Sequence, residues 1–169
     1  MVFASFDDNV ESLEDYMSPD ILKDFDATFD GRKLEILGYW RNRQRGNWKL
    51  YHENLKDPYH ATLLHVYLAT FRLMVAGQKS AMIVDESGRH SVMASTKDDD
   101  IVIDEETASQ MKSAFRDGME LNDPEFLDYV QEFDSPWTVT MQIIWPNLVV
   151  QRELNTLGIR HIVPRGPHA

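Results

Sequence analysis

The sequence predicts an α+β domain in which an antiparallel sheet packs against helices. In several segments apolar residues recur at helical spacing, and in others they alternate with polar residues on either side of a short turn. The chain has 169 residues, of which 43% are hydrophobic and 11% aromatic, so it is long enough to bury the core of one domain. Helices beside a mostly antiparallel sheet define this class.

The first part of the chain is expected to hold two helices and a strand. Ser12 can cap a short acidic helix over residues 12–16. Pro19 can begin a second helix, which carries apolar residues at roughly helical spacing and which Gly31 ends. Residues 33–43 alternate imperfectly between apolar and polar side chains and are therefore expected to form a strand.

Long helices are expected in the middle of the chain. Residues 48–56 and 59–75 have helical patterns, and Pro58 should interrupt them because it has no N–H to donate. A clear amphipathic helix is expected over residues 105–119, and residues 122–125 should open another.

The sheet is expected to consist of short strands joined by turns. The predicted strands are a hairpin over 80–96, a pair over 138–145 and 148–154, and a last strand over 158–163. Asp98, Asp99 and Asp100 are expected to form a solvated loop. Nothing after the last strand closes the sheet, so the domain is expected to be incomplete at the C-terminus.

The composition narrows the possible partners. With 17 basic and 28 acidic residues the net charge is −11, which repels nucleic acid and anionic membranes. No apolar run approaches the roughly 18 residues of a membrane-spanning helix, and the N-terminus has no signal-peptide pattern. The absence of cysteine excludes disulfides and cysteine-ligated metal sites in this chain, and is consistent with the cytoplasm.

One short stretch concentrates the residues that could carry chemistry. Asp57, His60 and His65 lie within nine positions, beside Asn54. Two imidazoles and a carboxylate are the ligands of a mononuclear non-haem iron(II) site. On a straight helix, residues five apart diverge by about 140°. A shared metal therefore requires an irregular helix between Asp57 and His65, either through a π-bulge or through a kink near Pro58.

Each of these residues also has a purely structural interpretation. Two histidines five residues apart are more often ordinary members of a partly buried helix. Asp57 could hold the N–H of the His60 imidazole, could cap the helix that begins after Pro58, or could do both. Asn54 is either a weak ligand or orienting group, or simply an exposed helical residue.

A family resemblance favours the metal interpretation. Residues 46–65 resemble the segment that carries both iron-binding histidines in the large (alpha) subunits of Rieske-type aromatic-ring-hydroxylating oxygenases. The similarity is to the branch of salicylate 5-hydroxylase and anthranilate dioxygenase. Further segments resemble other parts of the family, namely residues 2–6, 133–137, 144–148 and 160–167.

The resemblance implies a role for each candidate residue. His60 and His65 would ligate Fe(II), Asn54 would lie near the metal, and Asp57 would pass electrons from the Rieske cluster of a neighbouring subunit. The implied fold is a helix-grip-like antiparallel sheet. The implied reaction inserts oxygen from O2 into a salicylate- or benzoate-type aromatic acid, with electrons from NAD(P)H through a reductase and ferredoxin in a trimer-based oligomer.

Parts of such an enzyme are expected to lie outside this chain. A Rieske [2Fe–2S] cluster needs two cysteines and two histidines, so a chain without cysteine cannot hold one. In the family the Rieske domain precedes residue 2, and the third iron ligand, a carboxylate, lies beyond residue 169. Residues 1–169 are therefore expected to be a partial catalytic domain that binds iron weakly and is inactive by itself.

The remaining polar residues are weaker candidates. The acidic residues between 98 and 106 form a charge run that is more typical of a solvated loop than of a metal site, and His52 is expected to pack in the core. An arginine could bind a substrate carboxylate. The candidates are Arg41, Arg43, Arg45, Arg72 and Arg160, and the candidate apolar walls are Leu64, Leu68, Met74 and Ile144.

Two other functions remain open from the residues alone. A helix packed on an antiparallel sheet can enclose a hydrophobic ligand without catalysing a reaction. The same histidines could also serve a metal-dependent hydrolase, although the chain has no His-Glu-x-x-His helix. Metal affinity that depends on His60 and His65 would separate the oxygenase from the non-enzymatic binding domain.

Overall fold

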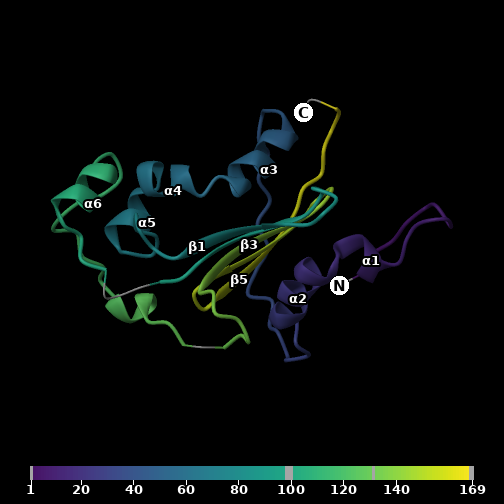
Figure 1. Cartoon of the computed structure of the whole chain (residues 1–169), viewed down its shortest axis with the longest axis horizontal. Coiled ribbons are helices and arrows are strands. Elements are labelled where there is room, and N and C mark those ends of the chain that lie inside the picture. The colour runs from purple at the N-terminus through teal and green to yellow at the C-terminus, as the bar shows by residue number, and fades with distance from the viewer. Residues whose placement is uncertain (1, 98–100, 131, 168–169) are drawn as a thin grey trace.

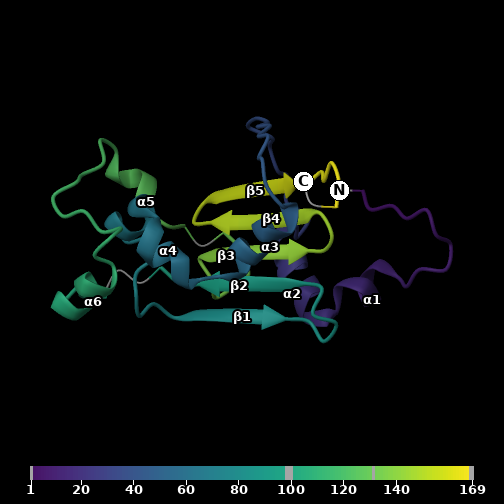
Figure 2. The ribbon, with the colours of Figure 1, turned by 90° about the horizontal axis from the view of Figure 1, so that it is seen from above.

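The computed structural model describes residues 2–97, 101–130 and 132–167, and it confirms the α+β class. Its centre is a five-stranded antiparallel sheet, in which the spatial order of the strands is their order in the chain (Figures 1 and 2). The strands are β1 (Ser80–Val84), β2 (Ser91–Ser95), β3 (Val139–Ile144), β4 (Leu148–Glu153) and β5 (Thr156–His161). The loop predicted over Asp98 to Asp100 lies outside the described residues, as does His168.

Short helices lie on both sides of the sheet, with α1 and α2 on one face and α3, α4 and α5 on the other (Figure 1). Their bounds are α1 (Leu13–Met17), α2 (Pro19–Thr28), α3 (Trp48–Lys56), α4 (Tyr59–Leu64), α5 (Val66–Thr70), α6 (Glu105–Gln110) and a 3-10 helix η1 (Pro124–Leu127). No described helix is long and apolar enough to cross a membrane.

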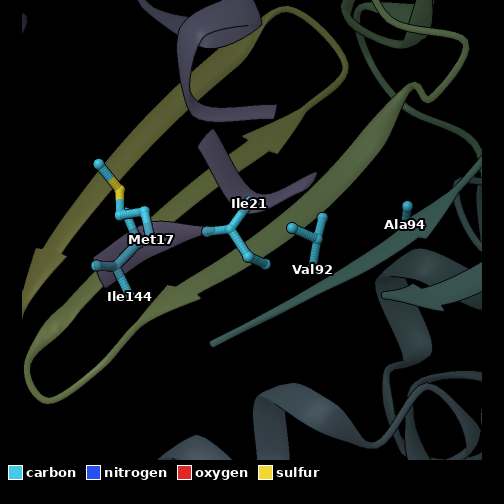
Figure 3. Packing of buried hydrophobic residues seen from close by; sticks show 5 residues of the cluster. All are labelled: Met17, Ile21, Val92, Ala94 and Ile144. Atoms are coloured by element: carbon cyan, nitrogen blue, oxygen red, sulfur yellow. The ribbon is translucent and has the colours of Figure 1, made fainter. Parts of the chain in front are cut away.

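Alternation along the strands divides the core between the two faces. On one face, Met17 and Ile21 from α1 and α2 pack against Val92, Ala94 and Ile144 (Figure 3). A buried polar contact also holds α2 on this face. The side-chain amide of Gln142, buried on β3, donates to the Ile21 carbonyl at 2.7 Å.

The opposite face carries α3 and α4. Leu55 of α3 packs against Ile143 and Val149. Each of these two residues is next in sequence to one that faces α1 and α2, so its side chain leaves the opposite face of the sheet. His52 is fully buried on this side, and its Nε2 lies 3.1 Å from the carbonyl oxygen of Pro146, to which it donates. The packing role expected for His52 is therefore confirmed, and burial lowers the pKa of its imidazole.

The predicted helix starts are confirmed by their caps. The Ser12 hydroxyl oxygen accepts from the amide of Asp15 at 3.1 Å, and the Asn47 side chain accepts from the amide of Lys49 at 3.1 Å. Pro19 occupies the first turn of α2, where its missing N–H costs nothing.

The strand predicted over residues 33–43 is wrong. This segment has no regular structure and crosses from the face that carries α2 to the face that carries α3 (Figure 1). It makes no ladder hydrogen bonds with any described strand, so nothing fixes its alternation. Its large apolar side chains are exposed, namely Leu34, Ile36, Leu37, Tyr39 and Trp40.

The long helices are not found among the described residues either, since the longest, α2, has ten. The helix expected over 59–75 breaks at His65 and ends at Thr70. The helix expected over 105–119 ends at Gln110, and only the 3-10 helix η1 forms after residue 122. Apolar spacing alone did not show where packing onto the sheet would bend the chain.

A buried ion pair ties α2 to β4. The Arg152 side chain is 1% exposed, and its Nη2 donates to Oδ1 of Asp24 at 3.0 Å. The hydroxyls of Thr140 and Ser135 accept two further bonds from the guanidinium, each at 3.1 Å. Burial raises the pKa of the Asp24 carboxyl, and the Arg152 charge opposes this rise. Neither partner can be removed alone without leaving the other buried and unpaired.

We expect Asp24→Ala to lower the free energy of unfolding by about 3 kcal/mol, because the buried Arg152 loses its counter-charge. Urea denaturation measures this loss. The matched control is Asp26→Ala, an exposed aspartate on the same helix, which should change stability by less than about 0.5 kcal/mol. Equal effects of the two substitutions would contradict a structural role for the ion pair.

Candidate metal centre

The helix that carries the two histidines is broken twice, as their spacing predicted. α3 ends at Lys56, α4 begins after Pro58, and His65 lies between α4 and α5 with φ −91° and ψ 88°. The break at His65 is local, because its amide still donates to Ala61 at 3.0 Å and its carbonyl accepts from Ala69 at 3.0 Å. The irregularity is thus a break at the histidine itself, in addition to the one at Pro58, rather than a π-bulge.

These breaks bring both imidazoles to one point. Nε2 of His60 lies 3.2 Å from Nε2 of His65, and the ring centroids are 5.1 Å apart. The Asn54 side-chain nitrogen, from α3, lies 3.0 Å from the same Nε2 of His60. The structure therefore gathers three of the four residues singled out in the sequence around a single nitrogen atom.

Asp57 holds the His60 ring from the other side. The main-chain carbonyl of Asp57 accepts from Nδ1 of His60 at 2.6 Å, so Nδ1 carries a proton and the ring is held with Nε2 facing His65. The Asp57 carboxylate caps α4, since Oδ1 accepts from the amides of Tyr59 and His60 at 2.8 and 3.3 Å. The two interpretations of Asp57 coexist, although the carbonyl rather than the carboxylate makes the closer contact with the ring.

The donor set fits a divalent metal ion. Two imidazole nitrogens bound at about 2.1 Å and roughly at right angles are about 3.0 Å apart, close to the separation of the His60 and His65 nitrogens. Within the described ranges, no group of three or more His, Asp, Glu or Cys side chains is placed to hold a metal. His60 and His65 could supply two nitrogen ligands, whereas Asn54 presents its amide NH2 group, which donates a hydrogen bond and does not ligate a metal.

The described acidic residues of the charge run, and two further histidines, lie away from His60 and His65. Glu105 and Glu106 are in the first turn of α6 and do not line the cavity beside His60 and His65. His90 is buried under α1, where its Nδ1 accepts from the amide of Trp145 at 3.1 Å. His161 is at the end of β5, next to the Asn147 amide.

A cavity of about 540 Å³ opens beside the histidines, between the helices α3 to α5 and the sheet. A volume of this size suits a small aromatic molecule. Leu64, Leu68 and Met74 line it, as predicted, but Ile144 faces α1 and α2 on the other side of the sheet, so that prediction is wrong. Of the arginine candidates, only Arg160 lines this cavity.

Sequence reasoning missed four polar residues of the cavity. Tyr51 comes from α3, Tyr67 from α5, and Gln151 and Glu153 from β4, and all line the same space as the histidines. Their signal was present but weak. Gln151 and Glu153 occupy alternate positions of a strand, and polar residues there face inward only if the sheet has this register.

An imidazole pair thus converges on the wall of a cavity. The comparisons with known proteins identify the family of the chain. The model of the ring hydroxylating alpha subunit (catalytic domain) family matches residues 32–169. The chain therefore belongs to the catalytic-domain family of ring hydroxylating alpha subunits.

The chain is also similar to three characterised proteins over almost its full length. It is 46% identical to the large oxygenase component of salicylate 5-hydroxylase from Ralstonia sp, over 98% of this chain and 39% of that protein. It is 40% identical to the large subunit of anthranilate 1,2-dioxygenase from Burkholderia cepacia, over 99% of this chain and 39% of that protein. It is 35% identical to alpha subunit 2 of the terminal oxygenase component of terephthalate 1,2-dioxygenase from Comamonas sp, over 98% of this chain and 40% of that protein. The chain thus spans about two fifths of the length of these relatives.

We expect Asp57→Ala to lower the free energy of unfolding by about 1 kcal/mol, because α4 loses its capping oxygen. Asp57→Asn keeps a side-chain oxygen that can cap α4, so it should lower the free energy of unfolding by only a few tenths of the amount lost in Asp57→Ala. In both variants the Nδ1–H of His60 should stay hydrogen-bonded, since its acceptor is the main chain. Urea denaturation and ¹⁵N NMR of the ring measure the two effects, and equal destabilisation by Ala and Asn would contradict the cap.

Proposed function

We propose that this chain provides the mononuclear Fe(II) site of a ring-hydroxylating oxygenase that inserts oxygen from O2 into a small aromatic acid. The observation that carries the proposal is the approach of the His60 and His65 Nε2 atoms to 3.2 Å on the wall of a cavity of about 540 Å³. Family membership supports the same class of reaction. The position of α3 over the sheet, with α4 and α5 following toward the ends of the strands, also supports a helix-grip-like arrangement (Figure 2).

His60 and His65 would hold the iron. When bound, Fe(II) supplies O2 binding and activation, because a 2-His-1-carboxylate site leaves coordination positions open. The contact of the His60 Nδ1 with the Asp57 carbonyl would hold the ring with its Nε2 toward His65, as a ligating imidazole requires. Asn54 would orient the site through its side-chain amide, which lies 3.0 Å from Nε2 of His60.

Asp57 would connect this site to an electron donor. Its side chain is 50% exposed, and Oδ2 lies 3.4 Å from Nδ1 of His60, so it joins the surface to the imidazole. The [2Fe–2S] Rieske cluster itself requires cysteines that this chain does not have, so the cluster would come from elsewhere in the assembly. A reductase and ferredoxin would supply electrons in an assembly built from trimers.

Arg160 would bind the carboxylate of the aromatic acid. Its guanidinium donates to the Tyr51 hydroxyl at 2.8 Å and to the Gln151 side-chain oxygen, which are both neutral. Among the described residues no carboxylate lies within ion-pair distance of Arg160, so its positive charge is uncompensated at close range. A guanidinium has five N–H donors and binds carboxylates in a planar, two-pronged geometry. The names of the relatives, a salicylate hydroxylase and an anthranilate dioxygenase, support an acid of this type.

We expect His60→Ala and His65→Ala each to weaken the binding of Co(II) or Fe(II) by about a hundredfold or more, because each removes one of two adjacent ligands. Metal titration followed by the visible absorption of Co(II) measures this loss. The matched control is His161→Ala, whose imidazole lies outside the cavity lining and which should leave affinity unchanged. Affinity that survives both substitutions would exclude the metal site and favour a non-enzymatic ligand-binding domain.

We expect Arg160→Met to weaken the binding of benzoate by about tenfold or more, because the carboxylate loses its charge-assisted hydrogen bonds. Isothermal titration with benzoate measures the change. Arg43→Met removes the same charge from an exposed position outside the cavity and should leave affinity unchanged. Equal weakening by both substitutions would reduce the role of Arg160 to a general electrostatic one.

A further inference from the structure

A row of polar side chains crosses the floor of the cavity, below the histidines. The Tyr51 hydroxyl accepts from Arg160 at 2.8 Å, and Arg160 also donates to the side-chain oxygen of Gln151. The amide nitrogen of Gln151 in turn donates to Oε2 of Glu153 at 2.8 Å. All four residues line the cavity. Gln151 thus bridges the Arg160 guanidinium and the Glu153 carboxylate, which make no direct ion pair with each other.

Glu153 is placed to meet a bound molecule. It lies two positions beyond Gln151 on β4, so both side chains leave the sheet on the cavity side. It is half-buried, and its second carboxylate oxygen accepts no hydrogen bond from any residue that the structure describes. Its charge also acts across the cavity, since burial and then Glu153 raise the pKa of the Tyr67 hydroxyl, and Tyr67 lines the same space.

We propose that Glu153 selects aromatic acids that carry a hydroxyl or amino group, by accepting a hydrogen bond from that group while Arg160 holds the carboxylate. The inference rests on the proposed function, because it assumes that an aromatic acid occupies this cavity. A half-buried carboxylate repels an anionic ligand that has no hydrogen-bond donor for it, and it attracts a ligand that has one. Recognition is sharp for a donor that meets a buried acceptor, because the analogue without it leaves that acceptor unpaired.

The test compares benzoate with its 2-, 3- and 4-hydroxy and amino derivatives, by isothermal titration into the intact chain. The wild-type chain should bind at least one derivative about tenfold more tightly than benzoate. Glu153→Met should bind that derivative less tightly and benzoate more tightly, because one substitution removes both the acceptor and the repulsion. Opposite changes for two ligands cannot come from partial unfolding, which weakens both.

Two further variants sharpen the comparison. Glu153→Gln keeps an acceptor oxygen but loses the charge, so its preference should fall between those of the wild type and Glu153→Met. Glu120→Met, an exposed glutamate outside the cavity lining, should change neither affinity. If Glu153→Met still prefers the hydroxy or amino derivative over benzoate, this inference is overturned. The proposed function would still stand in that case, provided that benzoate binding depends on Arg160. Failure of every acid to bind the wild-type chain overturns both.

Discussion

The strict alternation of side chains along β4 is the constraint on which the packing on both faces of the sheet depends. Gln151 and Glu153 face the cavity, and Arg152 between them points to the opposite side, where it pairs with Asp24 of α2. A slip of one residue in register would bury Glu153 under α2 and expose the guanidinium in the cavity. The buried ion pair that holds α2 therefore also fixes which charges face the cavity.

The candidate metal centre is built by giving up helical continuity. A straight helix from Tyr59 onward would make more regular hydrogen bonds, but it would turn His60 and His65 away from each other. The break at His65 keeps the bonds on either side of it, to Ala61 and Ala69, so little hydrogen bonding is lost. Asp57 supplies both the cap that restarts the chain as α4 and the carbonyl that orients the first imidazole. The same residue, Asp57, therefore satisfies the backbone at the start of α4 and orients the His60 imidazole.

The cavity joins two kinds of recognition that come from different elements. Helices α3 to α5 and the breaks between them bring the two imidazoles to its wall, and strands β4 and β5 bring a row of charged and neutral polar groups to its floor. A metal on the wall and an anchored acid on the floor would place the reacting ring between them, which is the arrangement a ring oxygenation requires. Under the proposed function, holding the ring close to the metal would lower the barrier through proximity.

The sequence by itself determined the features that rest on local rules. Turn residues and proline positions located the hairpins and helix starts. The five-residue spacing of His60 and His65 predicted a broken helix if the two imidazoles converge, because helical periodicity is fixed by backbone geometry. The sequence wrongly predicted a strand over residues 33–43, since a strand needs a partner, and it did not locate the true ends of the helices, which depend on tertiary packing. Only the tertiary structure decided that Arg160 and Glu153 share a cavity with the histidines. That juxtaposition depends on the pairing of β4 with β5 and on helices packed above them, which are contacts between residues far apart in the chain.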